Sequence, residues 1–396
     1  MYSDQFQKLR NKIQSTYGEE ILFSKDCIPL SEDLFSRIKS KISPQTLRRL
    51  FGFIKDEIKI SNTSLQLLSN YCGYENYNDL LNGNTVGKAL NESEVKYIKL
   101  FFSISSNNLG FDENYHYASK NISKLLFSNS NLLNKTSTFL SKNPAAQVYF
   151  FERFPYLDGI CSGYEIHLKK YLFEKRNQEA QLFGNCLMYL SYALSNNSKR
   201  KSQIKLINSL PIEDKIHPFP FARMFASNIM ENYLNNNVEE LEYWISYCLK
   251  EANKPDKSKK EYINFPYFQF IIADVFNLIE RPYEAEEILR IGELDYKRIP
   301  DTTLDEGYIE ALDLIKAINL FQLGKISECK RMFKRINSKD IIFVMHDYFL
   351  IQRLIVELRL IKSKASTKYI TINNQLLNLI EKTNFTFFLD KISKSK

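Results

Sequence analysis

Apolar side chains recur every three or four residues along most of the chain, which places them on one face of an α-helix. Glycine and proline, the residues that most often interrupt helices, number only 12 and 11 among 396 residues. We therefore expect an all-α protein whose helices are joined by short turns. A chain of this length exceeds one ordinary core, so two or three units are expected.

The first 82 residues predict five short helices that form one compact domain. Their predicted ranges are 3–17, 31–41, 43–53, 62–74 and 77–81. In the second helix Ser31 is the expected N-cap, and Leu34, Phe35 and Ile38 are the expected inward face. Asn62 is the expected N-cap of the fourth helix.

The third predicted helix combines clear boundary signals with positive charge. In ISPQTLRRLFGF, residues 42–53, Ser43 suits the N-cap, Pro44 the first helical position and Gly52 the stop. Between residues 34 and 55 there is no acidic residue. The basic residues of that window are Arg37, Lys39, Lys41, Arg48, Arg49 and Lys55. Such a cluster attracts DNA phosphates, and glutamine and arginine side chains can pair with base edges in the major groove.

Residues 1–82 resemble the helix-turn-helix domain of the lambda-repressor-like class. The segments that carry this resemblance are the second, third and fourth predicted helices, SEDLFSRIKSK, SPQTLRRLFGF and NTSLQLLSNYCGY. The resemblance implies that double-stranded DNA is the partner. It implies that Ser43, Gln45, Thr46 and Arg49 face bases or nearby phosphates, while Arg48 and Lys41 lie against the DNA backbone. One departure is the turn IKSKIS, which is about two residues longer than the usual glycine-containing turn.

The rest of the chain predicts a linker at residues 83–92, irregular helical hairpins at 93–216 and a helical array at 217–396. Two hairpins of the array superpose with a spacing of 44 residues. The corresponding positions are Ala273 with Ala317, Ala285 with Cys329, and Leu289 with Phe333. This alternation of small and large residues resembles the tetratricopeptide repeat over residues 260–340.

The repeat departs from the family pattern at one turn, where Glu280 stands in place of the glycine that Gly324 supplies. Its tryptophan and proline positions also do not match. Any antiparallel helix pair with small crossing residues would look similar. An α-solenoid is nevertheless favoured over a single bundle, because more than ten helices cannot share one core.

No constellation of catalytic or metal-binding residues is recognised, so we expect no enzyme, no cofactor and no metal site. The six cysteines lack CxxC spacing and the four histidines lack HExxH spacing. Cys161 and His167 form only a weak nucleophile–base candidate. His346 and Asp347 are adjacent, and adjacent helical residues point about 100° apart, so we expect no dyad from them.

The net charge of +8 and the pI of about 8.9 permit a nucleic-acid or acidic partner without requiring one. The start of the chain has no apolar signal region, and no run of 18 apolar residues exists. The bacterial cytoplasm is the expected location, with no membrane partner.

The sequence thus favours a DNA-binding transcriptional regulator. Its helix-turn-helix domain would contact duplex DNA, and its array would form a homodimer or receive a peptide or protein ligand. The alternative is a non-enzymatic scaffold whose N-terminal domain binds a protein partner. An enzyme without visible motifs is the third and least favoured interpretation.

Overall fold

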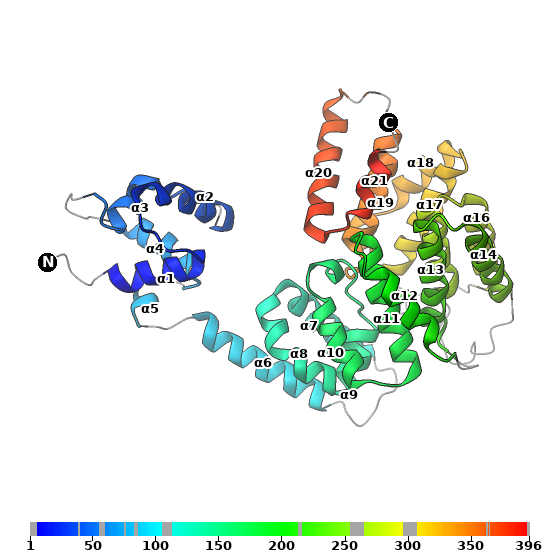
Figure 1. Cartoon of the computed structure of the whole chain (residues 1–396), viewed down its shortest axis with the longest axis horizontal. Helices are drawn as coiled ribbons and strands as arrows, with labels where there is room; N and C mark the ends of the chain where they lie inside the picture. The colour runs from blue at the N-terminus through cyan, green and yellow to red at the C-terminus, as the bar shows by residue number, and fades with distance from the viewer. Residues whose placement is uncertain are drawn as a thin grey trace. The chain divides into compact units, whose positions relative to one another are not determined.

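All regular secondary structure that the structure describes is helical, as predicted (Figure 1). The structure is a computed structural model, and it describes residues 6–38, 40–54, 60–74, 77–82, 86–104, 113–212, 216–253, 265–295, 307–361, 363 and 365–393. The chain divides into two compact units, residues 1–98 and 99–396, and each is described by itself. The division falls within helix α6 (Val86–Ile104), beyond the predicted end of the first domain at residue 82.

The first unit is built from five short helices around one core, followed by part of α6. The five helices are α1 (Gln7–Tyr17), α2 (Cys27–Ile38), α3 (Pro44–Leu50), α4 (Asn62–Tyr71) and α5 (Tyr77–Asn82). The 3-10 turn η2 (Ser24–Asp26) leads into α2. Leu9 and Ile13 of α1, Leu34 of α2, Leu47 of α3 and Leu68 of α4 are completely buried and form one cluster. Their burial gives these short helices a stability that their length alone would not provide.

Three predicted details of this unit are wrong. Helix α2 begins at Cys27, and Ser31 is a buried residue inside it, whose hydroxyl donates to the carbonyl of Ile42 at 2.5 Å. Cys27, Leu30 and Leu34 lie on the buried face of α2, whereas Phe35, predicted to point inward, is 53% exposed. Helix α4 is capped by Ser61 rather than by Asn62, because the Ser61 hydroxyl accepts from the backbone N–H of Ser64.

The segment predicted as a linker, residues 83–92, is helical from Val86 onward. Residues 83–85 lie outside the described residues. Helix α6 continues well beyond the predicted linker, and its Ile98 and Phe102 are buried. An isolated glycine such as Gly87 is tolerated in a helix that is anchored elsewhere.

The second unit is a succession of helices and helical hairpins. Its helices are α7 (Glu113–Ser128), α8 (Ser130–Lys142), α9 (Pro144–Ala146), a π-helix (Gln147–Glu152), α10 (Glu165–Glu174), α11 (Gln178–Leu194), α12 (Arg200–Ser209), α13 (Pro218–Leu234), α14 (Val238–Ala252), α15 (Tyr267–Leu278), α16 (Pro282–Asp295), α17 (Tyr308–Gln322), α18 (Ile326–Arg335), α19 (His346–Arg359), α20 (Thr367–Thr383) and α21 (Phe387–Ser393). Short 3-10 turns at Ile160–Ser162 and Ser338–Asp340 complete it. Helix α11 packs against α13, α13 against α15, and α15 against α17, so the hairpins stack side by side.

Four successive hairpins share the same turn. Asn196, Asn236, Glu280 and Gly324 follow α11, α13, α15 and α17, and all four adopt a left-handed backbone conformation. At each turn the next residue's N–H bonds a carbonyl five residues back, as from Arg281 to Phe276 at 2.8 Å. The same bond closes the other three turns. Glu280 therefore takes the conformation that Gly324 takes one hairpin later.

The small residues at which helices were predicted to cross are all completely buried. They are Ala273, Ala285, Ala317 and Cys329. Leu289 and Phe333, the large partners, are also buried. The shared turn extends the series to α11/α12, which the sequence analysis placed among irregular hairpins. That hairpin was missed because its left-handed residue is Asn196, and not the glycine that marks such turns most often.

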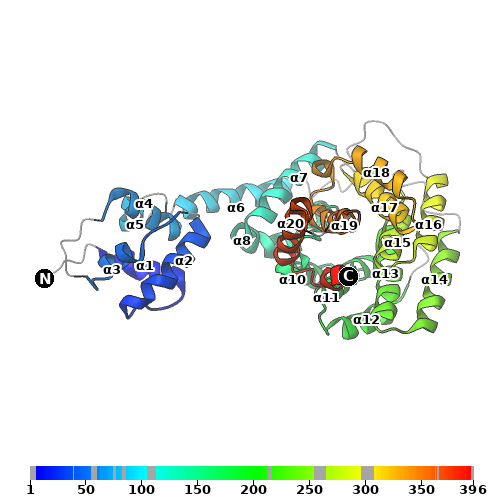
Figure 2. The ribbon, with the colours of Figure 1, turned by 90° about the horizontal axis from the view of Figure 1, so that it is seen from above.

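Residues between 127 and 158 contact the start of α19 and the segment just before it. The side chain of Asp158 accepts from the backbone N–H groups of Asp347 and Tyr348 at 2.8 and 2.9 Å. The ring of Phe343 lies against Phe127 and Phe154. Figure 2 shows the hairpins following one another around an arc, with the red C-terminal helix α21 inside it.

Candidate functional site

Helix α3 is positioned as the sequence predicts. Ser43 caps it, its hydroxyl accepts from the backbone N–H of Thr46 at 3.1 Å, and Pro44 occupies the first position. Gly52 ends the helix with φ of +79°, a conformation that side chains with a Cβ rarely adopt. The hydroxyl groups of Ser43 and Thr46 lie 2.9 Å apart and bond each other. Both are therefore engaged in closing the helix start.

The three described arginines of the basic window differ in how far they are occupied. Arg37 bonds Asp33 at 3.0 Å and the carbonyl of Thr16 at 3.2 Å, and its guanidinium stacks on Tyr71. Among the described residues, Arg48 has one side-chain hydrogen bond, from its Nε to the carbonyl of Ser24 at 3.1 Å. Arg49 is half-buried, and its enclosed Nε has no hydrogen-bond partner among the described residues.

Four of the predicted residues lie at the end of the α2–α3 turn and along α3: Lys41, Gln45, Arg48 and Arg49. The side chains of Lys41 and Gln45 are exposed. Ile42 between them is buried and is held by the Ser31 hydroxyl, which fixes the longer turn to the core. Lys39 and Lys55, also predicted for this site, lie outside the described residues.

A strip of exposed apolar side chains on α2 was missed by sequence reasoning. Ile28 and Phe35, seven residues apart on one face of α2, are both exposed. Leu22 and Phe23, just before η2, are more than half exposed. The spacing of Cys27, Leu30 and Leu34 would have revealed the strip, because these three residues share one helical face and Phe35 does not lie on it. We call these four residues the apolar strip.

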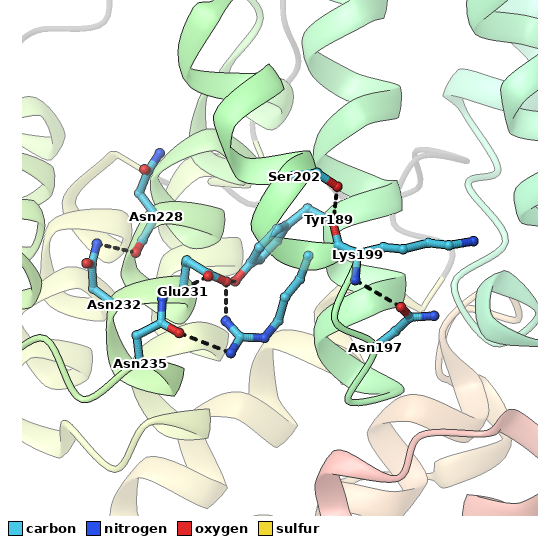
Figure 3. Close-up of polar contacts among 9 residues, drawn as sticks. Tyr189, Asn197, Lys199, Ser202, Asn228, Glu231, Asn232 and Asn235 are labelled. Atoms are coloured by element: carbon cyan, nitrogen blue, oxygen red, sulfur yellow. Dashed lines mark hydrogen bonds and ion pairs between the residues drawn. The ribbon is translucent and has the colours of Figure 1, made fainter.

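In the second unit, the polar groups between α11, α12 and α13 satisfy one another (Figure 3). Glu231 accepts from Tyr189 at 3.0 Å, from Asn235 at 2.8 Å and from Arg200. Arg200 also donates to the Asn235 side chain at 3.1 Å. Because these groups are already paired, the cluster fixes the hairpins and offers little to a ligand.

A second buried polar group joins α13, α15 and α19. Both carboxylate oxygens of Asp274 accept hydrogen bonds, from Tyr348 at 2.7 Å and from Gln352 at 3.0 Å. Burial raises the pKa of Asp274. Arg223 is 5% exposed and stacks on Phe219, and its Nε has no partner among the described residues.

Cys161 and His167, the weak candidate pair, have separate partners. The Cys161 thiol donates to the carbonyl of Ser191, and His167 Nδ1 lies 2.7 Å from the Ser137 hydroxyl. Burial raises the pKa of Cys161 to about 11 and lowers the pKa of His167 to about 4. A nucleophilic cysteine requires the opposite trend for the thiol.

The buried His167 predicts a dependence of stability on pH. Its pKa is lower in the folded state than the usual 6.5, so the unfolded chain binds the proton more tightly between pH 4 and 6.5. Stability is therefore full above pH 6.5 and falls as the pH drops toward 4, by at most about 3 kcal/mol. Urea unfolding of wild type and His167→Gln at pH 4.5 and 7.5 measures it. An equal pH dependence in both proteins would contradict the assignment.

The expectation for His346 and Asp347 is wrong, because their side chains lie 3.2 Å apart. The hydrogen bond to Asp347 raises the pKa of His346, and that to His346 lowers the pKa of Asp347. Both residues lie in the first turn of α19, where the rotamers of the first residue are not restricted by a preceding helical turn. Lys382 also pairs with Asp347 at 2.6 Å, and Asp158 bonds the helix start. These contacts anchor α19.

Within the described residues, no group of three histidine, cysteine or acidic side chains is arranged to hold a metal ion. Among those same residues, no helix is both long and apolar enough to cross a membrane.

Comparisons with protein-family models, with curated proteins and with solved structures find no match to this chain.

Proposed function

We propose that the protein is a DNA-binding transcriptional regulator whose α2–turn–α3 segment contacts duplex DNA. The residues assigned to this contact are Lys41, Gln45, Arg48 and Arg49. Arg37 is left out, because Asp33, Thr16 and Tyr71 already occupy its guanidinium. Ser43 and Thr46 act mainly by closing the start of α3.

Arg49 is the observation that carries the proposal. A half-buried guanidinium has lost part of its hydration, and the side chain of Arg49 has no hydrogen bond or ion pair with the residues that the structure describes. A phosphate is the ligand that best compensates such a group, because it accepts charge-assisted hydrogen bonds from arginine. Arg48 follows the same pattern in part: within the part of the chain that the structure describes, its guanidinium bonds through Nε alone.

Two exposed side chains extend this contact. Lys41 adds a third positive charge, and Gln45 offers the amide that pairs with adenine in the major groove. No acidic residue between positions 34 and 55 opposes the attraction. We therefore assign affinity to the three cations and a share of sequence preference to Gln45.

A salt titration of duplex binding tests the proposal. Full-length protein and a labelled duplex of mixed sequence are titrated between 50 and 200 mM salt. Each phosphate contact contributes about 0.9 to the slope of log affinity against log salt, so three contacts predict a slope near −3. Affinity that is absent at the lowest salt, or insensitive to salt, would refute DNA binding by this segment.

For the second unit we propose that the hairpin array receives a peptide or protein ligand, or joins two copies of the chain. Four hairpins with one shared turn support this role, because stacked hairpins create an extended binding surface. Such a ligand would change the spacing of two N-terminal units and thereby their fit to two half-sites.

The apolar strip favours the alternative function, a scaffold whose N-terminal unit binds a protein. Exposed Leu22, Phe23, Ile28 and Phe35 are more typical of a protein contact than of a phosphate contact. The alternative predicts no duplex affinity at low salt. It also predicts a single protein partner whose binding is lost in Phe35→Ser and kept in the Arg48→Ala/Arg49→Ala double variant. The DNA proposal predicts the reverse for duplex binding.

A further inference from the structure

Helix α21 lies across the first helices of several hairpins. It contacts α11 and α19. The ammonium of Lys391 donates to the Tyr233 hydroxyl in α13 at 3.1 Å and to Glu280, just after α15, at 3.3 Å. One short helix therefore touches elements that are far apart in sequence, inside the arc of hairpins (Figure 2).

Three residues hold α21 in place. Phe387, Phe388 and Lys391 are buried, whereas Leu389 and Asp390 are exposed. The ammonium of Lys391 lies over the rings of Tyr233 and Phe387. The helix thus presents two adjacent aromatic residues and, three positions after the second, a lysine.

Helix α21 leaves a cavity and, among the described residues, unpaired polar atoms on the surface that it covers. A cavity of about 40 Å³ remains between α15, α17, α19 and α21. Its lining includes three enclosed polar atoms without a hydrogen-bond partner among the described residues, namely Asn277 Oδ1, Gln322 Oε1 and Arg359 Nε. Asn277 is only 3% exposed. Buried polar atoms that lack a partner destabilise the arrangement that encloses them.

We infer that the inner face of the hairpin array beneath α21, formed by α11, α13, α15, α17 and α19, is a peptide-binding surface, and that α21 is its resident occupant. A peptide with two adjacent aromatic residues and a lysine three positions on binds there by replacing α21. The backbone of such a peptide can donate to Asn277 Oδ1 and Gln322 Oε1 and accept from Arg359 Nε. With α21 in place, these three atoms have no hydrogen-bond partner among the described residues. Residues 384–386, beginning with the left-handed Asn384, join α21 to α20. Phe385 among them is completely buried against Tyr348 of α19, so it undocks together with α21.

This inference deepens the proposed role of the array as a receiver of a ligand, and it does not require that the first unit bind DNA. The test compares the full chain with a variant that ends at Asn384. A fluorescein-labelled peptide of residues 384–393 is titrated into each, and its anisotropy is followed. We expect saturable binding to the shortened chain and about tenfold weaker binding to the full chain, because there the surface is occupied. The same peptide carrying Phe388→Ala and Lys391→Glu is the matched control.

A folded shortened chain that does not bind the peptide, or a full chain that binds it equally well, would overturn the inference. If the shortened chain does not fold, amide hydrogen exchange of the full chain decides. Independent undocking predicts that the amides of α21 exchange at least about a hundredfold faster than those in the middle of α19. Equal protection of the two helices would show that α21 is a permanent part of the core. Neither experiment contains DNA, so its result is separate from that of the duplex titration.

Discussion

Replacing both Arg48 and Arg49 with alanine should weaken duplex binding and reduce its salt dependence together. Each arginine that contacts a phosphate contributes about 0.9 to the slope of log affinity against log salt, so the slope should become shallower by about 2. Neither side chain forms an ion pair with the described residues, and Arg48 has a single bond, to Ser24. The folded state should therefore lose little stability. Fluorescence anisotropy with a labelled duplex at four salt concentrations measures the slope.

The matched control is Lys8→Ala, which removes an exposed positive charge from α1 of the same unit. Lys8 bonds the carbonyl of Leu81 at 3.1 Å, and α1 is not assigned to the DNA contact. For Lys8→Ala, the slope of log affinity against log salt should equal that of the wild type within error. If the control and the double variant change the slope equally, general charge and not α3 accounts for the binding.

The largest loss of stability should come from Asp158→Ala. This carboxylate accepts two backbone N–H groups at the start of α19, and these donors have no partner within the helix. The substitution leaves both buried, which costs about 2–4 kcal/mol. It also releases a contact between segments 189 residues apart. Urea unfolding followed by circular dichroism gives the free energy of unfolding.

Asp158→Asn is the control, because its single carbonyl oxygen can still accept one of the two bonds. It should lose about half as much stability as the alanine variant. Burial raises the pKa of Asp158 to about 7, so its effect on pH dependence opposes that of His167. Both comparisons are therefore made as differences between the wild type and the corresponding variant. A free energy unchanged in Asp158→Ala would contradict the assigned role.

Local sequence rules predicted those parts of the fold that local interactions determine. Ser43 and Pro44 set the start of α3 and Gly52 sets its end. These signals are local, because a cap, a fixed φ and a left-handed residue each act within a few positions. Ser31 misled the same rules, because its hydroxyl bonds Ile42 in a neighbouring segment. The turn at Glu280 was visible only by comparison with Gly324, since glutamate rarely adopts positive φ.

The candidate site was predictable to a smaller extent. The engagement of Arg37 could have been read from Asp33, which is four residues earlier on the same helix and one residue outside the acid-free window. The contact of Arg48 with Ser24 could not, because the two are separated by a loop and a helix. The role of α21 also depends on tertiary contacts, since Lys391 meets residues more than a hundred positions earlier.

A photo-crosslink from Gln45 tests most directly whether α3 faces DNA. The photoreactive residue p-benzoylphenylalanine is placed at position 45 of the full chain, and at position 7 as a control, because Gln45 and Gln7 are both exposed glutamines. After irradiation with a labelled duplex, the account predicts a covalent protein–DNA product from position 45 and none from position 7. Equal products from both positions, or none from position 45 while the duplex is bound, would show that α3 does not face the DNA.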